Sequence, residues 1–569
     1  MATATTGPPA WLGRIAADPA WSPEVRAMAS STLGSAGAPG NQAASSRTDV
    51  LGEVVRYRHV FGPVAAALAA RELWRRYLEG GERGAAAEAS LRRAGVTRRS
   101  VLKGITGMAM LTGASSLLTA CDLVMVPSPI TTNGVTPSTN LLQIIVDDLN
   151  EYVGFLGGYP GPIHTPNMDA LAAESLSFEQ FHISVPICPP SRMTLMWGVD
   201  APTHHVLRTG PPSFAPYNAY AAANPNHFVE VLRANGFTQV GGGKTYHDSS
   251  SIYQPTWDEY FSNGHAHLVG PAGPDGIFFD YGTLPAGAAH PDNDLTDYLL
   301  ARMPTIGNEP RFHMAAGYRL PHLGWVVPQE FLDLYPLEEV VVHDVVDDWD
   351  DLGPIGRDLL GDGISIWYLG AQERSWLEWV EQFGNRQVYL QHYLASMSYV
   401  DHQIGRLLDG LAAQPFADET VVTLVSDNGY HHGENGAMRK GALRDQSTRV
   451  PFLIRHPELP PQTFSTPVSS LNYAPTVLGL LGVTPPVEME GVDLLRQLPT
   501  GFISSYFGGT DGLSISESVI STEDPRYRWV FHRVEEGHPR YDEGVLPGMP
   551  ELELYDRSTD PHETINLLG

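Results

Sequence analysis

The stretch NLLQIIVDDLN, residues 140–150, joins a continuous apolar run to two acids. A run without alternation, such as residues 141–146, is typical of a strand buried on both faces of a parallel sheet. A second stretch of this kind, TVVTLVSDNGY at residues 420–430, also runs from apolar residues into Asp427 and Asn428. Ligands of open α/β sheets bind at the carboxyl ends of the strands. The two stretches therefore predict an α/β domain with polar groups gathered at one sheet edge.

Four oxygen-bearing side chains follow these two strands: Asp147, Asp148, Asp427 and Asn428. Carboxylate and amide oxygens suit a hard cation such as Ca²⁺ or Mg²⁺. Two adjacent buried acids without a cation would repel each other, and one would stay protonated. Either pair alone is more often a strand cap or the start of a turn, so the prediction of a metal site depends on the two pairs together.

Further candidate residues lie between and after the two strands. GGGKTYHD contains Lys244 and His247, GYRLPHLGW contains His322, and HHGENGAMRKG contains Lys440. Any one of these is more often a surface lysine or a buried structural histidine. Cations and imidazoles around a metal suit attack on an anionic tetrahedral ester, whose negative charge needs fixed positive groups.

Composition limits the class of protein. The chain has 569 residues, 42% of them hydrophobic and 18% charged, which is typical of a globular chain with room for more than one domain. The formal net charge of -28 argues against nucleic-acid binding, which needs clustered Lys and Arg. It also argues against a highly sulfated polymer as partner unless the site itself is locally basic.

The segment TRRSVLKGITGMAMLTGASSLLTAC, residues 97–121, resembles a twin-arginine export signal that ends in a lipoprotein processing box. Arg98 and Arg99 form the pair, and Cys121 would become the lipid-anchored first residue of the mature chain. The alternative is a buried helix that happens to follow two arginines. This interpretation predicts use of the twin-arginine machinery, placement in the periplasm or cell envelope, and membrane contact through the lipid alone. Residues 1–96 would be an extension, partly helical or disordered, unless the true start lies downstream.

Cys188 lies in PICPPSRMTL, residues 186–195, and is one of only two cysteines in the chain. If Cys121 carries a lipid, Cys188 has no disulfide partner, and its thiol is either a reactive centre or an inert core residue. Cys188-Pro189-Pro190-Ser191-Arg192 resembles the Cys-x-Pro-Ser-Arg signature of type I sulfatases. The resemblance spans nearly the whole chain after residue 140, through SDNGYHHGENG to ELELYDRSTDPHETINLL.

The resemblance implies an alkaline-phosphatase-like α/β sandwich over residues 140–498, with a central, mostly parallel sheet. A linker at 122–139 would precede it, and a small C-terminal antiparallel sheet with a terminal helix would occupy 499–569. Asp560 would cap that helix, with Glu563 completing a capping box. The acidic segment at 343–352 is expected to be a solvated loop.

In this family the cysteine is oxidised to Cα-formylglycine by a formylglycine-generating enzyme. The resemblance assigns the shell of one divalent metal, usually Ca²⁺ with Mg²⁺ as the alternative, to Asp147, Asp148, Asp427, Asn428 and the modified Cys188. It implies that Arg192 holds the formylglycine, and that Lys244 and Lys440 bind sulfate oxygens. His247 would lie beside the formylglycine and His322 near the leaving group. Similarity to the iduronate-2-sulfatase branch implies a sulfated sugar as substrate.

Three departures from the family pattern qualify this interpretation. Met196-Trp197-Gly198 replaces the usual Leu-Thr-Gly, Asn428 stands where this branch often has His, and Leu320 stands where relatives often carry Lys. The change at Leu320 predicts an altered substrate rim. Two alternatives stay open: a phosphodiesterase or phosphonate monoester hydrolase with the same formylglycine, and an inactive lipoprotein that binds sulfated glycans.

Overall fold

The computed structural model describes residues 126–127, 130, 136–207, 214–247, 256–262, 281–343, 351–362, 377, 380–381, 386–508, 514–534 and 551–568. Arg98, Arg99, Cys121 and most of the acidic segment at 343–352 lie outside these ranges, so the export signal and the acidic loop stay predictions. Within them, every helix is too short or too polar to cross a membrane.

The two apolar runs form neighbouring parallel strands inside an eight-stranded sheet. β2 (Asn140–Val146) pairs along its whole length with β10 (Thr420–Ser426), last residue opposite last residue. β8 (Phe312–Tyr318) lies parallel on the other side of β2, and β5 (Thr238–Gly243) lies parallel to β8. Four strands therefore end at the same sheet edge, which brings together segments from distant parts of the chain.

The full order of the sheet is β14-β3-β13-β10-β2-β8-β5-β6. Its outer strands are β3 (Leu176–Phe178), β6 (Glu259–Phe261), β13 (Phe452–Arg455) and β14 (Gln462–Phe464). β13 runs antiparallel to both of its neighbours, β10 and β3, whereas the remaining pairs are parallel. The prediction of a mostly parallel central sheet is confirmed.

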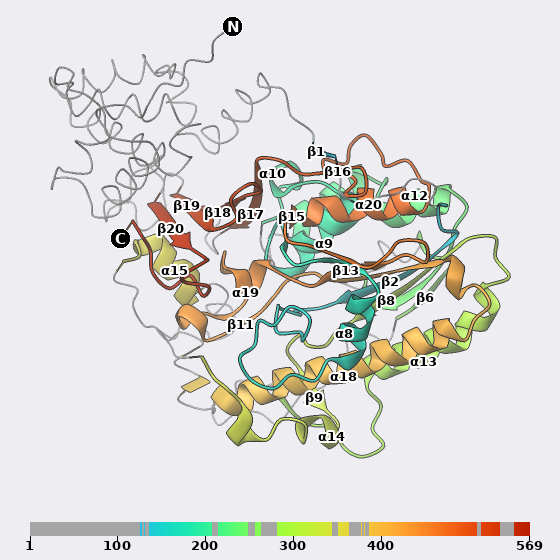
Figure 1. Cartoon of the computed structure of the whole chain (residues 1–569), viewed down its shortest axis with the longest axis horizontal. Helices are drawn as coiled ribbons and strands as arrows, with labels where there is room; N and C mark the ends of the chain where they lie inside the picture. The colour runs from blue at the N-terminus through green and yellow to red at the C-terminus, as the bar shows by residue number, and fades with distance from the viewer. Residues whose placement is uncertain are drawn as a thin grey trace, which may run out of the picture. The chain divides into compact units, whose positions relative to one another are not determined.

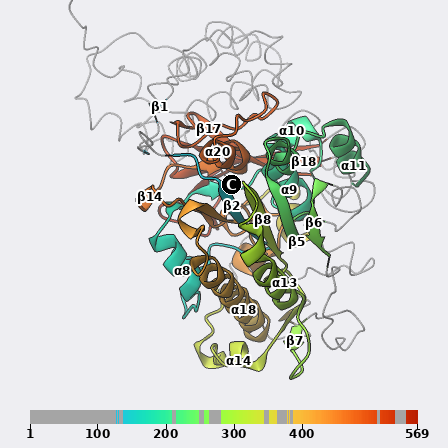
Figure 2. The same ribbon diagram turned by 90° about the vertical axis from the view of Figure 1, so that its right-hand side faces the viewer.

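Helices cover both faces of the sheet, as Figures 1 and 2 show. One face carries α8 (Pro166–Ala173), α13 (Pro291–Ile306) and α18 (Arg386–Ala412), and the other carries α9 (Cys188–Trp197), α12 (Phe228–Ala234) and α20 (Tyr473–Leu480). Because successive strand residues point to opposite faces, Ile144 of β2 packs in the first core and Ile145 in the second. Burial on both faces explains why the strand sequence shows no alternation.

Shorter elements connect these layers. They are β1 (Val126–Pro127), β4 (Phe181–His182), β7 (Tyr281–Thr283), β9 (Trp325–Val327), β11 (His431–His432), β12 (Met438–Arg439), β15 (Val468–Ser469), β16 (Gln497–Leu498), α10 (Ala201–His204), α11 (Phe214–Ala223), α14 (Gln329–Leu332), α15 (Pro354–Asp362) and α19 (Asp445–Thr448).

A separate four-stranded antiparallel sheet follows, as predicted. Its strands, in order, are β17 (Phe502–Gly508), β18 (Ser514–Ser521), β19 (Tyr527–Val534) and β20 (Glu551–Asp556). β17 lies against the larger domain, since Tyr506 N donates to Ser184 O over 2.6 Å.

The predicted terminal helix is wrong. Residues 557–568 form turns instead. Asp560 makes cap-like contacts, with Oδ2 accepting from Ile565 N at 2.8 Å. Glu563, however, has a φ of 55°, and its carboxylate is buried against Arg528 and Arg557. The buried ion pairs hold Glu563 in a left-handed conformation that a helix cannot include, so tertiary contacts override the local capping signal.

Candidate active site

The predicted metal ligands come together where β2 and β10 end. Asp147 and Asp148 follow β2, Asp427 and Asn428 follow β10, and all four are at most 1% exposed. One oxygen or sulfur atom from each of Asp147, Asp148, Asp427 and Cys188 lies within 4.8 Å of the others. The parallel pairing of the two strands produces this cluster, because it sets the two acidic pairs side by side.

Three oxygens of this cluster accept no hydrogen bond: Asp147 Oδ1, Asp148 Oδ2 and Asn428 Oδ1. Buried polar atoms nearly always have a partner. Burial raises the pKa of Asp427 to about 7 despite the charge of Arg192, and the charges of Asp147 and Asp148 add to the rise. Burial therefore disfavours the charged form of Asp427, and a bound cation would favour it. The donor set fits a hard divalent cation.

Cys188 is the first residue of α9, the helix that enters the cluster. Pro189 and Pro190 occupy the first helical turn, where a backbone N–H is not needed. Cys188 Sγ lies 3.8 Å from Asp148 Oδ1. Burial raises the pKa of the Cys188 thiol well above its ordinary value, and the charge of Asp147 raises it further. An unmodified Cys188 would thus be a protonated thiol and a poor nucleophile.

Arg192, one turn further along α9, ties three strand ends together. Its Nε donates to Asp427 Oδ2 at 2.8 Å after β10, and its Nη2 lies 3.4 Å from Asp147 Oδ1 after β2. Its Nη1 donates to Thr245 O at 3.1 Å after β5. Arg192 is fully buried. Its contacts hold the carboxylates that surround Cys188.

Two lysines approach Cys188 from different loops. Lys440 Nζ lies 2.8 Å from Cys188 Sγ and contacts Asp148 Oδ1, whereas Lys244 Nζ lies 3.8 Å from the same sulfur and contacts Asp147 Oδ2. Gly243 allows the loop of Lys244 to come this close, because its φ is +66° and a Cβ there would lie 2.2 Å from a backbone oxygen of β8. Two positive charges therefore face the sulfur.

Both predicted histidines belong to this site. His322 Nδ1 donates to Leu323 O at 2.9 Å, so the neutral ring carries no proton on Nε2, which lies 3.9 Å from Asp148 Oδ2. Burial lowers the pKa of His322 well below its usual range, and the charge of Lys244 lowers it further. Burial and Lys244 do the same to His247. Both rings are therefore held in the neutral form, and the side chain of His322 is 19% exposed.

Some residues that shape the site carry no signal in the sequence. Asp292 on α13 accepts from Arg319 N at 2.9 Å and from Leu320 N at 3.0 Å, and so holds the turn before His322. Tyr393 on α18 donates from its hydroxyl to Asp148 O at 2.8 Å. The expectation for Leu320 is wrong, because its side chain is 1% exposed and packs in the core rather than at a substrate rim.

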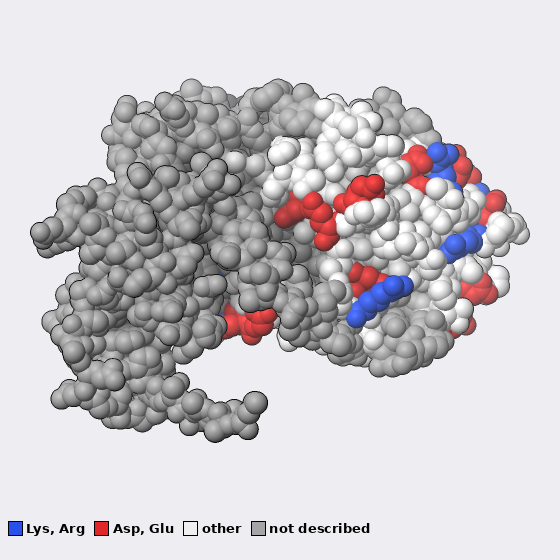
Figure 3. All heavy atoms as spheres, turned by 90° about the horizontal axis from the view of Figure 1, so that it is seen from above, with Lys and Arg blue, Asp and Glu red and all other residues white. Residues whose placement is uncertain are grey.

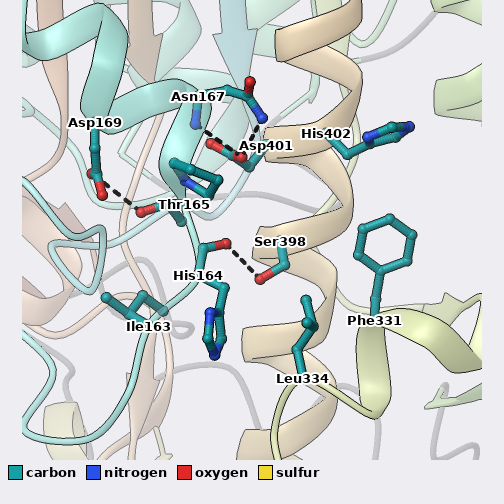
Figure 4. A pocket seen from close by; sticks show the side chains of 11 residues that line it. Ile163, His164, Thr165, Asn167, Asp169, Phe331, Leu334, Ser398, Asp401 and His402 are labelled. Atoms are coloured by element: carbon teal, nitrogen blue, oxygen red, sulfur yellow. Dashed lines mark hydrogen bonds between the residues drawn. The ribbon is translucent and has the colours of Figure 1, made fainter.

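A pocket of about 380 Å³ lies between α8, α14 and α18 and contains none of the predicted site residues (Figure 4). Its polar groups bond to one another: Asp401 Oδ2 accepts from Asn167 Nδ2 at 2.7 Å, and Ser398 Oγ donates to His164 O at 2.7 Å. No cation lines this pocket among the described residues. The strand edge is therefore the better candidate for chemistry on an anionic ester.

Comparison with known proteins points the same way. The sulfatase family domain matches residues 139–483. A sulfatase of Formosa agariphila is 30% identical over 454 residues, which cover 75% of this chain and 82% of the relative. Human iduronate 2-sulfatase is 28% identical over 404 residues, 65% of this chain and 68% of the relative.

Solved structures show the same fold. One neighbour is a protein in complex with its substrate D-glucosamine-2-N,6-O-disulfate, with a TM-score of 0.56 and 19% sequence identity over 76% of this chain and 94% of that one. The fold is that of alkaline-phosphatase-like sulfatases, and the match to the family domain covers more than half of the chain. This chain therefore belongs to the sulfatase family and is a sulfuric ester hydrolase.

Proposed function

We propose that this enzyme hydrolyses a sulfate ester of a sugar, using a Cα-formylglycine made from Cys188 and one divalent cation, Ca²⁺ in preference to Mg²⁺. One observation carries the proposal: the residues that follow β2 and β10, which lie beside Cys188, have three buried oxygens without hydrogen-bond partners, and Cys188 itself faces two lysines. The similarity to iduronate 2-sulfatase supports a sulfated sugar as substrate. Asp147, Asp148, Asp427 and Asn428 would hold the cation.

The formylglycine and the cation together would supply a hydroxyl nucleophile that ionises near neutral pH. The protein's own residues supply the charge balance. Asp147, Asp148 and Asp427 are matched by Arg192, Lys244 and Lys440. The two positive charges of a divalent cation then balance one negative charge on the ionised nucleophile and one on the ester. Lys440 and Lys244 would bind the ester oxygens from either side of position 188.

His322 and His247 would handle protons. With Nδ1 committed to Leu323 O, His322 has only Nε2 available, and it would carry the proton there for the departing sugar oxygen. The negative charge of a bound ester would raise the lowered pKa of His322 and favour that protonated form. His247, close enough to Lys244 and Asp147 for their charges to act on its pKa, would take the proton that frees the sulfate.

The first experiment is the mass of the peptide that contains Cys188, from protein produced together with a formylglycine-generating enzyme. An aldehyde at this position is expected. An intact thiol, under conditions that convert a control sulfatase, would contradict the mechanism and favour an inactive glycan-binding protein.

A second experiment compares turnover of an aryl sulfate, an aryl phosphodiester and a panel of sulfated monosaccharides. We expect the sulfate esters to be preferred. A phosphodiester is also singly charged, so faster turnover of that compound would identify the protein as a phosphodiesterase or phosphonate monoester hydrolase with the same machinery.

We also propose that modification precedes folding and that export follows it. Every residue of α9 is buried, so a modifying enzyme could reach Cys188 only before the chain folds. Twin-arginine export through Arg98 and Arg99 carries folded proteins, and Cys121 would then receive a lipid. The change Cys121→Ala is expected to release the enzyme from the membrane fraction. Unchanged fractionation would contradict the anchor.

On the face shown in Figure 3, Lys and Arg of the described residues are scattered among acidic side chains, which gives no support to a nucleic-acid partner.

A further inference from the structure

The loop that carries Lys440 lies between β12 and α19 and packs on the C-terminal sheet. Arg439 and Gly441, on either side of Lys440, have φ angles of 71° and 102°. A Cβ at Gly441 would lie 2.9 Å from the ring of Phe507 on β17. The chain therefore turns sharply as it leaves β12 and touches the C-terminal sheet one residue after Lys440. Its position depends on what it packs against.

Buried ionic contacts fasten the end of this loop to the C-terminal sheet and tail. Arg528 of β19 is fully buried, contacts Asp445 Oδ1, and donates from Nη1 to Leu443 O at 3.2 Å and to Ser518 Oγ at 2.8 Å. Its Nε also donates to Glu563 Oε1 at 2.5 Å. A single guanidinium thus joins the loop, the sheet and the C-terminal turn.

A second pair of contacts lies beside the first. Arg444 Nη2 donates to Glu553 Oε2 at 2.8 Å and to the hydroxyl of Tyr555 at 2.5 Å. Asp445 Oδ2 also accepts a hydrogen bond from Arg557 Nη2 at 2.6 Å. We call this set of residues the C-terminal clamp: Arg444, Asp445, Arg528, Glu553, Tyr555, Arg557 and Glu563.

We infer that the C-terminal clamp, through Arg528 and Asp445, sets the position of Lys440 relative to Cys188; this inference rests on the proposed function, in which Lys440 binds the sulfate. Leu443 and Asp445, which Arg528 holds, are three and five residues from Lys440. A displacement of 1 Å at a catalytic group can cost about a hundredfold in rate. Apolar side chains of the same volume would stabilise the sheet equally well. They would fix the orientation of the Lys440 loop less strictly than the planar guanidinium of an arginine does. The members of the clamp are positioning residues.

The test is the change Arg528→Lys, which keeps the charge but loses the fork. The probe is inorganic sulfate, with its dissociation constant measured by titration calorimetry on the full-length calcium-loaded enzyme, followed by kcat and KM on an aryl sulfate. We expect sulfate binding to weaken by about tenfold to a hundredfold. In a protein that already carries Lys440→Ala, Arg528→Lys should have no further effect on sulfate binding, because the lysine side chain that it would displace is absent.

The matched control is Arg526→Lys. Arg526 lies beside β19 and pairs with Asp556, but its contacts are with residues outside the Lys440 loop. It should leave sulfate binding unchanged. If Arg528→Lys does not fold, Tyr555→Phe replaces it, since it removes only the hydroxyl that Arg444 contacts.

The outcomes separate the two proposals. If the unaltered enzyme binds sulfate and the folded variants Arg528→Lys and Tyr555→Phe bind it equally well, the positioning role alone is overturned. The role would also be overturned if Arg528→Lys weakened binding by the same factor with and without Lys440, which is the result expected of a general structural effect. Unaltered enzyme that neither binds sulfate nor cleaves an aryl sulfate would overturn both the proposed function and this inference.

Discussion

Two buried clusters of this enzyme contain the same kinds of charge and differ in how those charges are used. The strand-edge cluster has three carboxylates and three cations: Asp147, Asp148, Asp427, Arg192, Lys244 and Lys440. The C-terminal clamp also has three of each: Asp445, Glu553, Glu563, Arg444, Arg528 and Arg557. Neither burial nor charge count distinguishes the two clusters.

The two clusters differ in the hydrogen bonds that their carboxylate oxygens accept. In the clamp, both oxygens of Asp445, Glu553 and Glu563 accept a hydrogen bond from the protein. In the strand-edge cluster, Asp147 and Asp148 each have one oxygen that accepts no hydrogen bond. Carboxylates whose oxygens all accept hydrogen bonds stabilise a structure, whereas buried oxygens that accept none are available to a ligand. The comparison indicates that function follows the unused acceptors.

The largest effect is expected from Cys188→Ala, which should separate activity from stability. We expect kcat/KM on an aryl sulfate to fall by about five orders of magnitude, as when a nucleophile is removed from a catalytic unit. The free energy of unfolding should change by about 1 kcal/mol or less. Steady-state kinetics and urea denaturation measure the two quantities. Activity above one hundredth of the unaltered level would show that position 188 does not supply the nucleophile.

The second effect tests stability at the clamp. Arg444→Met removes the cation that contacts Glu553 and should lower the free energy of unfolding by about 3–5 kcal/mol, with or without calcium, because it leaves a buried carboxylate short of a partner. Lys440→Met should cost a similar amount in calcium-free protein but less when calcium is present, since the ion replaces the lost charge beside Asp148. Urea denaturation in calcium and in a chelator measures both. Equal calcium dependence of the two variants would remove the distinction between the clusters.

The third effect is the direct consequence of the unused oxygens. Calcium at about a hundred times its dissociation constant should stabilise the unaltered enzyme by about 2.7 kcal/mol. Asp148→Asn should lose most of this stabilisation, and Glu553→Gln should keep it. Thermal melting with calcium or a chelator reads the difference. The prediction fails if calcium stabilises Asp148→Asn and the unaltered enzyme equally.

The contrast between the clusters also explains what the sequence could reveal. Asp148 and Asp427 were predictable as neighbours because each ends a continuous apolar run, and two such runs pair side by side in a parallel sheet. Cys188 and Arg192 were predictable from a short family signature. Each of these signals lies in one stretch of chain.

The residues that escaped prediction act across long separations. Asp292 holds the turn before His322 from a helix about thirty residues upstream. Glu563 matched the pattern of a capping box, yet it pairs with Arg528 and takes a left-handed conformation. Local patterns do not record such partners, because ion pairs between distant segments leave no periodicity in the sequence.

The smallest effect concerns pH and distinguishes two buried glutamates, Glu553 and Glu151, whose pKa values are shifted in opposite directions. Burial opposes ionisation of Glu553, but Arg444 and His532 hold its pKa below the ordinary value. Its stabilising effect is therefore present above pH ~4.3, the unfolded pKa, and is lost as the pH falls below it. Burial raises the pKa of Glu151 to about 8, so this residue costs stability increasingly from pH ~4.3 up to about 8.

The two glutamine variants should consequently show opposite pH profiles. Glu151→Gln should be more stable than the unaltered enzyme at pH 8 by about 1–2 kcal/mol, less than the full pKa shift implies because the amide must also be buried. That gain should vanish as the pH approaches 4, where Glu151 is neutral in both states. Glu553→Gln should be less stable than the unaltered enzyme at pH 7, and its deficit should shrink only below pH ~4.3. Urea denaturation across this range tests both, and parallel profiles would mean that burial alone governs these two carboxyl groups, whatever cations lie beside them.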